Sequence, residues 1–322
     1  EDKVLLDRYR ALYSYAYFRE TIKPRPTAPF YSAPATVAAL ARAQAAQIAL
    51  RGNPGEALRR LHEDTVFWRR VIADSRLLVN RMVAVAAIQT NAQLISEIIS
   101  TYRLPAGKLQ IAATTIRPLT DQERDLSDVF RYEFALGAHM FTHLDSHVYQ
   151  TDCDSDSWSA CLFGKLSTAS LLKPNAIINM SFERFDRIAQ TSKLPARLFL
   201  EQVKQAREDD ENRSFIKWHF AYNPIGKMLN AIPGDSLYHN YVGRVHNLDG
   251  FLRIVSLQVD MKRQGIRDSQ TASFLKDAGP NLYNPYTNEP MLWDAKKRSI
   301  YFHGMTDKEN EELLSKRFEI QL

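Results

Sequence analysis

The feature that most constrains this chain is a long apolar segment over residues 75–101. Leu78, Val83, Ile88 and Ile98 are among its apolar positions, and neither Gly nor Pro interrupts it. A helix that is apolar on most of its sides must be surrounded by other elements. The sequence therefore predicts a central helix within a larger helical assembly. The longest uninterrupted apolar run, residues 82–88, is too short for a membrane span, which needs about 20 residues.

Further helices are indicated by apolar spacing and by start signals. In the turn Gly52-Asn53-Pro54-Gly55, Asn53 suits an N-cap and Pro54 the first helical position, so we expect a helical hairpin around it. Thr120 and Glu123 have the spacing of a capping box. We expect helices over residues 2–20, 35–51, 54–73, 75–101, 120–147, 158–172, 180–192, 195–210, 236–264 and 306–317, turns at 223–224 and 233–234, and a linker ending at Pro118.

The C-terminal residues change character. Residues 291–293 and 299–302 are typical of a small hairpin, and residues 318–322 of a third strand. The predicted fold is therefore mainly α, a multi-helix bundle or orthogonal helical array with a small C-terminal β-hairpin or three-stranded element. We divide it into a basic helical region (1–119), a central helical region with a cysteine loop (120–280) and a small α/β element (281–322), packed as one unit.

Charge is distributed unevenly along the chain. Residues 1–119 hold 17 Lys and Arg against 9 Asp and Glu, whereas residues 120–322 hold 25 against 28. This asymmetry indicates contact with an acidic surface, although solvated helix faces explain it equally well. The composition, 45% hydrophobic and 25% charged, is that of a globular protein and excludes disordered, collagen-like and disulfide-scaffold classes. No RNA motif or zinc-finger spacing is present, so we expect no nucleic-acid partner.

The two cysteines, Cys153 and Cys161, lie eight residues apart in a polar, loop-like stretch. We expect them to form a disulfide, which would stabilise the fold by roughly 2–3 kcal/mol and indicate an oxidising compartment such as a periplasm. Two reduced thiols in a cytosolic protein are the alternative. The chain begins at Glu1 rather than Met, so we expect a mature or trimmed product, and a signal peptide and a membrane anchor are both compatible with this start.

Two resemblances are local. Residues 41–46 with the turn at 52–58 resemble one tetratricopeptide-type hairpin, but a second copy is absent and a solenoid needs about three. Residues 223–227, 244–250 and 284–293 resemble segments of uncharacterised envelope proteins of Gram-negative bacteria, with Asn284 and Asn288 in place of that family's Asp and Gly. The second resemblance implies an inner-membrane protein with a periplasmic domain, and it implies no activity.

The sharpest candidate for chemistry is the histidine row His139, His143 and His147, which shares one face of a predicted helix. Two of these histidines could bind a metal ion, but three in a row span about 12 Å of helix axis. The Glu of a His-Glu-x-x-His motif is absent, because Met140 follows His139. Ordinary surface histidines are the alternative, and we expect no cofactor.

Other catalytic signatures have little support in the sequence. The acidic residues Asp152, Asp154 and Asp156 have the spacing of the first three ligands of a calcium loop. Ser157, however, replaces the Gly of that loop, and Phe163 replaces its bidentate Glu. Gly-x-Ser-x-Gly, Gly-x-Gly-x-x-Gly and Walker A patterns are missing from the sequence.

Aromatic residues near the C-terminus, Tyr286, Trp293 and Tyr301, are a candidate interaction surface, with core packing as the alternative. We expect a non-catalytic periplasmic helical domain of an envelope protein, tethered to the inner membrane by a segment before residue 1. It would bind an acidic protein partner or organise a complex. The alternatives are a hydrolase, with or without a metal ion, near His139 and His143, and a carrier for an apolar ligand such as a lipid.

Overall fold

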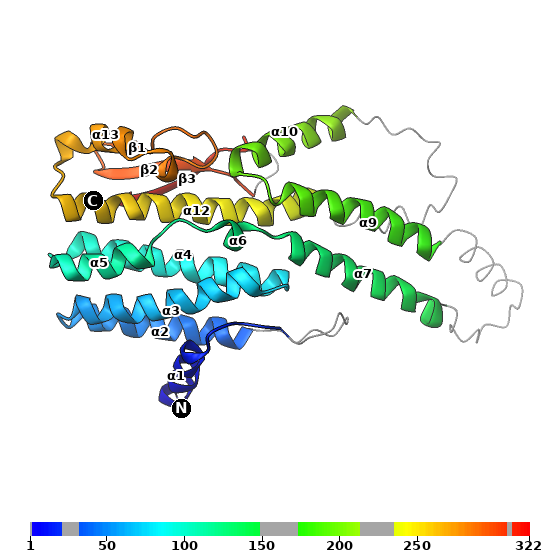
Figure 1. The fold of residues 1–322 in the computed structure, drawn as a ribbon, viewed down its shortest axis with the longest axis horizontal. Helices are drawn as coiled ribbons and strands as arrows, with labels where there is room; N and C mark the ends of the chain where they lie inside the picture. The colour runs from blue at the N-terminus through cyan, green and yellow to red at the C-terminus, as the bar shows by residue number, and fades with distance from the viewer. Residues whose placement is uncertain (1, 21–31, 149–172, 213–234, 308–310) are drawn as a thin grey trace, which may run out of the picture.

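The computed structural model has helices throughout and a small three-stranded antiparallel sheet at the C-terminal end (Figure 1). This confirms the predicted mainly α fold with a minor β element. The structure describes residues 2–20, 32–148, 173–212, 235–307 and 311–322.

The elements follow one another in a simple order. The helices of the N-terminal half are α1 (Asp2–Ala11), a short 3-10 turn η1 (Leu12–Ser14), α2 (Ser32–Leu50), α3 (Pro54–Asp74), α4 (Leu78–Thr101), α5 (Ala106–Thr115), α6 (Asp121–Arg124) and α7 (Ser127–Val148). The remainder comprises α9 (Pro174–Thr191), α10 (Ala196–Asn212), α12 (Asp235–Gln264), α13 (Asp268–Asp277), η3 (Pro280–Leu282), β1 (Leu292–Asp294), β2 (Ser299–Gly304) and β3 (Lys316–Gln321).

Helices α4 and α12 form the centre of the core. Ala84, Ile88 and Ile95 of α4 are completely buried, as the apolar pattern predicted. Among the described helices, α4 alone has the length and composition to cross a membrane, and 56% of that window is buried inside the protein. Helix α12 lies between α4 and α5 on one side and the sheet on the other (Figure 1). The apolar stripes of the helices are therefore used in packing against one another.

The hairpin of α2 and α3 follows its sequence signals. The Asn53 side chain accepts a hydrogen bond from the backbone N–H of Glu56 at 3.3 Å, and Pro54 begins α3. An N-cap of this kind contributes about 1 kcal/mol. The predicted cap, turn and hairpin are confirmed.

The sheet approaches α12 closely because the helix carries glycine at the contact. A Cβ built on Gly250 would lie 2.4 Å from the Phe302 ring. That ring stacks on Phe318 of β3, with centroids 5.1 Å apart. Gly250 therefore creates the space into which the aromatic face of the sheet fits.

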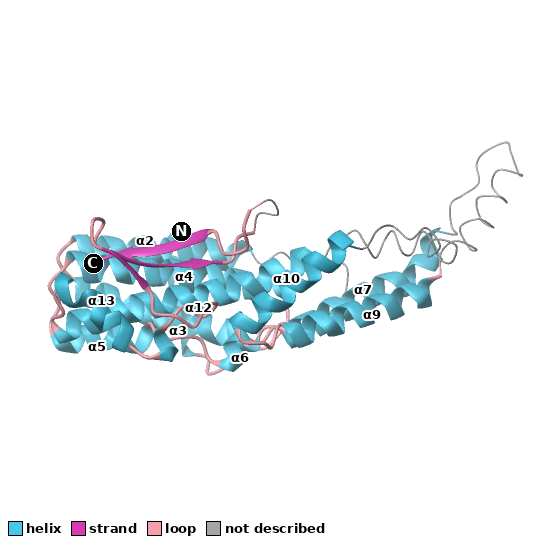
Figure 2. Cartoon of the chain, turned by 90° about the horizontal axis from the view of Figure 1, so that it is seen from above, coloured by secondary structure: helices cyan, strands magenta, loops and turns pink. Residues whose placement is uncertain are grey.

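Helices α7 and α9 pair along their length and extend beyond the rest of the bundle (Figure 2). Phe134 of α7 contacts Phe182 and Phe185 of α9, with ring centroids 5.4 Å and 6.4 Å apart. Aromatic contacts thus hold this arm together.

The N-terminal helix is held by a buried carboxylate of α3. Asp64, which is 3% exposed, accepts hydrogen bonds from the hydroxyls of Tyr9 at 2.6 Å and Tyr13 at 2.7 Å. Asn91 of α4 donates to the other carboxylate oxygen at 2.7 Å. Burial and the adjacent carboxylate raise the pKa of both tyrosines above the ordinary value. One carboxylate therefore fastens α1 to the core.

Several predicted boundaries are wrong. The helix expected over 120–147 is divided into α6 and α7. The division lies at Asp125, whose side chain accepts a hydrogen bond from the backbone N–H of Ser127, the first residue of α7, at 2.7 Å. The helix expected over 2–20 ends at Ala11. Residues 311–315 form turns rather than the expected helix, since the Thr306 N–H donates to the Leu313 carbonyl and closes a loop before β3.

Two helices were not expected, namely α5 in the predicted linker and α13. Helix α9 begins at Pro174, six residues before the predicted start. The capping box of Thr120 and Glu123 is present, although it begins the four-residue helix α6. The helix predicted over 158–172 and the turns at 223–224 and 233–234 lie outside the described residues.

Two glycine substitutions should have opposite effects on stability. Gly250→Ala should lower the free energy of unfolding by about 1–3 kcal/mol, because the new methyl group overlaps Phe302. Gly137→Ala in α7, where a Cβ meets nothing within 4 Å, should raise it by about 0.5–1 kcal/mol. Urea unfolding of both variants measures the difference, and equal effects would contradict the packing described.

Candidate functional site

A cleft of about 870 Å³ lies beside α12. Helix α6 and Asp125 after it border the cleft on one side. The turn between α9 and α10, the start of α10, and η3 with the loop after it border it on the other; Figure 1 shows where these elements lie. Its walls include the side chains of Asp121, Arg124, Asp125, Lys193, Arg197, His246, Asp249, Arg253, Asn281 and Asn288. Apolar side chains, among them Leu194, Leu198 and Pro285, lie between the charged ones. Segments far apart in the sequence thus form one depression of mixed polar and apolar lining.

Asp249 of α12 is the buried acidic group of the cleft, with 1% of its side chain exposed. Arg253, one turn further along α12, approaches it at 2.7 Å, and Arg124 of α6 at 3.6 Å. The backbone N–H of Leu119 donates to the same carboxylate at 2.8 Å. Arg253 also donates to the carbonyl of Tyr283 at 2.9 Å. This carboxylate therefore fixes three parts of the cleft wall.

His246, one turn before Asp249, is 2% exposed and has no hydrogen-bond partner on either ring nitrogen. Its ring packs against Phe199 and Tyr286, with centroids 5.3 Å and 6.2 Å away. Burial, together with the charges of Arg124 and Arg253, lowers the pKa of His246 to about 3. The imidazole is therefore neutral near pH 7 and can donate one hydrogen bond and accept one.

The mouth of the cleft is positively charged. Lys193 and Arg197 are exposed there, and Lys193 makes no ion pair with any described residue. Among the acidic groups, Asp249 is paired with two guanidiniums, and Asp121 is paired with Arg124. Four basic and three acidic described side chains line the cleft. Arg197 is paired with Glu201 outside the cleft at 3.3 Å, whereas Lys193 and Asp125 make no ion pair with any described residue.

The described residues around the cleft include no arranged nucleophile. Ser192 has the single hydroxyl side chain among them, and that hydroxyl donates to the Ala189 carbonyl at 2.8 Å. The Ser192 hydroxyl makes no hydrogen bond with His246, because neither ring nitrogen of His246 has a hydrogen-bond partner. A Ser–His pair for acyl transfer would require a hydrogen bond between them.

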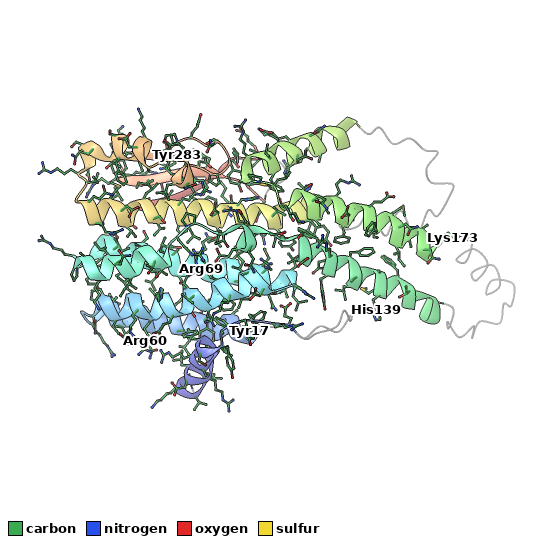
Figure 3. All side chains as sticks on the ribbon, viewed as in Figure 1. Tyr17, Arg60, Arg69, His139, Lys173 and Tyr283 are labelled. Carbon is green, nitrogen blue, oxygen red and sulfur yellow. The ribbon has the colours of Figure 1, made fainter. Side chains whose placement is uncertain are left out.

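The predicted histidine row is only partly described. His139 is half-buried on α7, out along the arm (Figure 3). The backbone of α7 is helical through His143 and His147, as predicted, but their side chains lie outside the described residues. Within the described part of the chain, no three His, Cys, Asp or Glu side chains converge as metal ligands. Metal binding by the row stays a prediction.

Cys153 and Cys161 lie outside the described residues. The disulfide, and the oxidising compartment inferred from it, therefore also stay predictions.

The predicted aromatic surface is wrong for Tyr286. Its side chain is 2% exposed, and its hydroxyl donates to Asn247 Oδ1 at 2.9 Å and approaches the Gly243 carbonyl at 3.0 Å. Two acceptors on α12 thus draw the ring into the core. Trp293 is half-buried against the core, and Tyr301 is half-buried beneath the Arg317 guanidinium, 3.7 Å from the ring centroid.

The sequence analysis did not predict the residues that line the cleft as a site, although their spacing on α12 contains a signal. His246, Asp249 and Arg253 are spaced three and four residues apart, on one side of a helix that carries many apolar residues. Such a polar row on a core-forming helix indicates either a buried cluster whose polar groups pair with one another or a binding site. The sequence predicts a helix over residues 236–264 and a resemblance to envelope proteins in this segment, but no site.

Comparisons of this chain with protein-family models, curated proteins and solved structures find no match. The chemistry assigned to the cleft therefore rests on its own residues, and the resemblances to envelope proteins and to a tetratricopeptide hairpin stay predictions.

The buried imidazole predicts acid sensitivity. The pKa of His246 is lowered from 6.5 to about 3. Below about pH 6.5 the imidazole therefore binds a proton in the unfolded chain but stays neutral in the folded chain. The stability present above that pH is lost as the pH falls, by at most about 3 kcal/mol between about pH 6.5 and 4.5. Urea unfolding across this range should show less of this loss in His246→Phe than in the wild type.

The matched control is His303→Phe on β2, which should keep the acid sensitivity of the wild type. If His246→Phe loses as much stability on acidification as the wild type, the imidazole is not held neutral in the fold.

Proposed function

We propose that this chain is a non-catalytic helical binding module that holds an acidic segment of a protein partner in the cleft beside α12. In this proposal the helical body is a scaffold, and the cleft provides the recognition. The location that the sequence predicts, the periplasm of a Gram-negative cell, is part of the proposal and rests on the cysteine spacing and the envelope-protein resemblance.

The observation that carries the proposal is the set of four basic side chains around the cleft. Arg253 and Arg124 flank the buried Asp249, and Lys193 and Arg197 are exposed beside them. The ring nitrogens of His246 are buried, so a bound segment would meet the charged groups and not the imidazole.

Charge favours an acidic segment. Lys193 and Arg197 at the mouth lie where a carboxylate would first meet the cleft, and exposed charges of this kind mainly steer association. Arg124 and Arg253 are already oriented by Asp249, so their remaining N–H groups can meet a second carboxylate without reordering. Guanidinium groups pair well with carboxylates because their donors form a planar fork.

The alternatives have less support. The hydrolase needs converging ligands or an activated nucleophile, and the described residues provide neither arrangement at His139 or in the cleft. The lipid carrier needs a predominantly apolar cavity, whereas seven charged side chains are interspersed with the apolar ones that line the cleft.

The proposal predicts charge-selective peptide binding. Fluorescence anisotropy with labelled hexaglutamate and hexalysine should show binding of the acidic peptide alone, and the affinity should fall as salt rises. Lys193→Glu should weaken binding on the order of tenfold, because it replaces attraction by repulsion at the mouth.

The matched control is Lys204→Glu, an exposed lysine of α10 outside the cleft, which should leave the affinity within about twofold. Equal weakening by both variants would show a general charge effect and contradict the cleft as the site. Competition by free glutamate at the same carboxylate concentration would assign the cleft to a small anion instead of a partner segment.

A further inference from the structure

The C-terminal sheet has an open edge along β3. This strand pairs with β2 from Lys316 to Gln321, and no strand of the described chain pairs with its other side. Figure 2 shows the sheet at one margin of the helical body. An open strand edge presents a row of backbone N–H and C=O groups with which an extended segment can pair.

The register of the sheet shows which residues of β3 face this edge. The Leu322 N–H donates to the Arg298 carbonyl at 2.9 Å, so the even-numbered residues of β3 bond to β2. Arg317 and Glu319 therefore direct their N–H and C=O groups away from β2, and no described group bonds to them there. Both residues are exposed. Four backbone groups of β3 are thus available to a further strand.

The middle of this edge lacks the features that protect strand edges in monomeric proteins, namely proline, bulges and mid-strand charges on the apolar face. Strand β3 has neither proline nor bulge, and its mid-strand residues on that face are the buried Phe318 and Ile320. Lys316, at the first position, places its ammonium 5.3 Å from the centroid of the Phe318 ring. The edge is closed at its end, where the Gln321 carbonyl accepts the Gln258 amide at 2.9 Å. The open part is therefore centred on Phe318.

We propose that two copies of this chain pair antiparallel through β3, so that their sheets join into one continuous sheet. The pairing is centred on Phe318, which places Arg317 of each copy opposite Glu319 of the other. Residues that face the open edge can exchange two backbone hydrogen bonds with the residue opposite, so each of these two pairs does so. A two-fold axis generates both pairs, and the assembly closes as a dimer.

Charge selects a second copy and this register. Arg317 and Glu319 already pair within the strand at 2.7 Å, and in the proposed register the two ion pairs adjoin, so that each guanidinium has a carboxylate of its own copy and one of the other beside it. Moving the centre by one residue would place Arg317 opposite Arg317, or Glu319 opposite Glu319, and like charges directly opposite destabilise a sheet. On the apolar face the Phe318 rings of the two copies become neighbours, each stacked on Phe302.

The interface is small. Strand β3 has six residues, whereas a standard interface takes about 20–30 residues from each partner, so the dimer is weak and depends on concentration. None of the described residues that line the cleft belongs to the sheet. The pairing therefore goes beyond the proposed function and does not depend on it.

Sedimentation equilibrium of the whole chain over a series of concentrations tests this proposal. The wild type should show a monomer–dimer equilibrium. Glu319→Lys should weaken the dimer about tenfold or more, because Arg317 of one copy then lies opposite a lysine of the other. The double variant Arg317→Glu with Glu319→Lys, which exchanges the two charges, should restore most of the affinity.

The matched control is Glu289→Lys, an exposed acidic residue on the loop before β1, which should dimerise as the wild type does. Residue-resolved hydrogen exchange adds a direct readout. The amides of Arg317 and Glu319 should become protected as the protein concentration rises, whereas those of Phe318 and Ile320, which bond to β2, should be protected throughout. A monomer at every concentration, a dimer that Glu319→Lys leaves intact, or a double variant that stays monomeric would overturn the proposal.

Discussion

The cleft depends on the ion cluster around Asp249. A carboxylate that is 1% exposed is costly by several kcal/mol unless charged or hydrogen-bonding groups surround it. Here Arg253, Arg124 and the Leu119 N–H meet that requirement. Because these groups come from α12, from α6 and from the segment before α6, satisfying one buried charge also sets the position of the cleft walls.

A second buried carboxylate, that of Glu123, holds helix α6, which forms one wall of the cleft. Glu123, which is 3% exposed, pairs with Arg69 at 3.0 Å and Arg117 at 2.8 Å and accepts the Thr120 N–H. The four residues of α6 are too few to be stable alone, so these bonds hold the helix in place. Arg124, the neighbour of Glu123, thereby projects toward Asp249. The binding surface that we propose is thus built on structural charges that are already paired.

Local signals predicted most of the fold, and long-range contacts explain most of the errors. Asn53 with Pro54 marks a helix start because its partners lie within three residues. The cleft could not be derived in this way, since Leu119 and Asp249 are 130 residues apart. Tyr286 was mistaken for a surface residue because its acceptors, on α12, are some forty residues earlier. The break at Asp125 was missed because an aspartate within a predicted helix does not reveal whether it caps a new one.

Hydrogen–deuterium exchange with and without hexaglutamate tests the central claim, that the cleft is a binding site, most directly. Our account predicts slower amide exchange in residues 192–198 and 281–288, which border the cleft, and unchanged exchange in α1. Unchanged exchange in both cleft segments at saturating peptide, or protection confined to another surface, would contradict it.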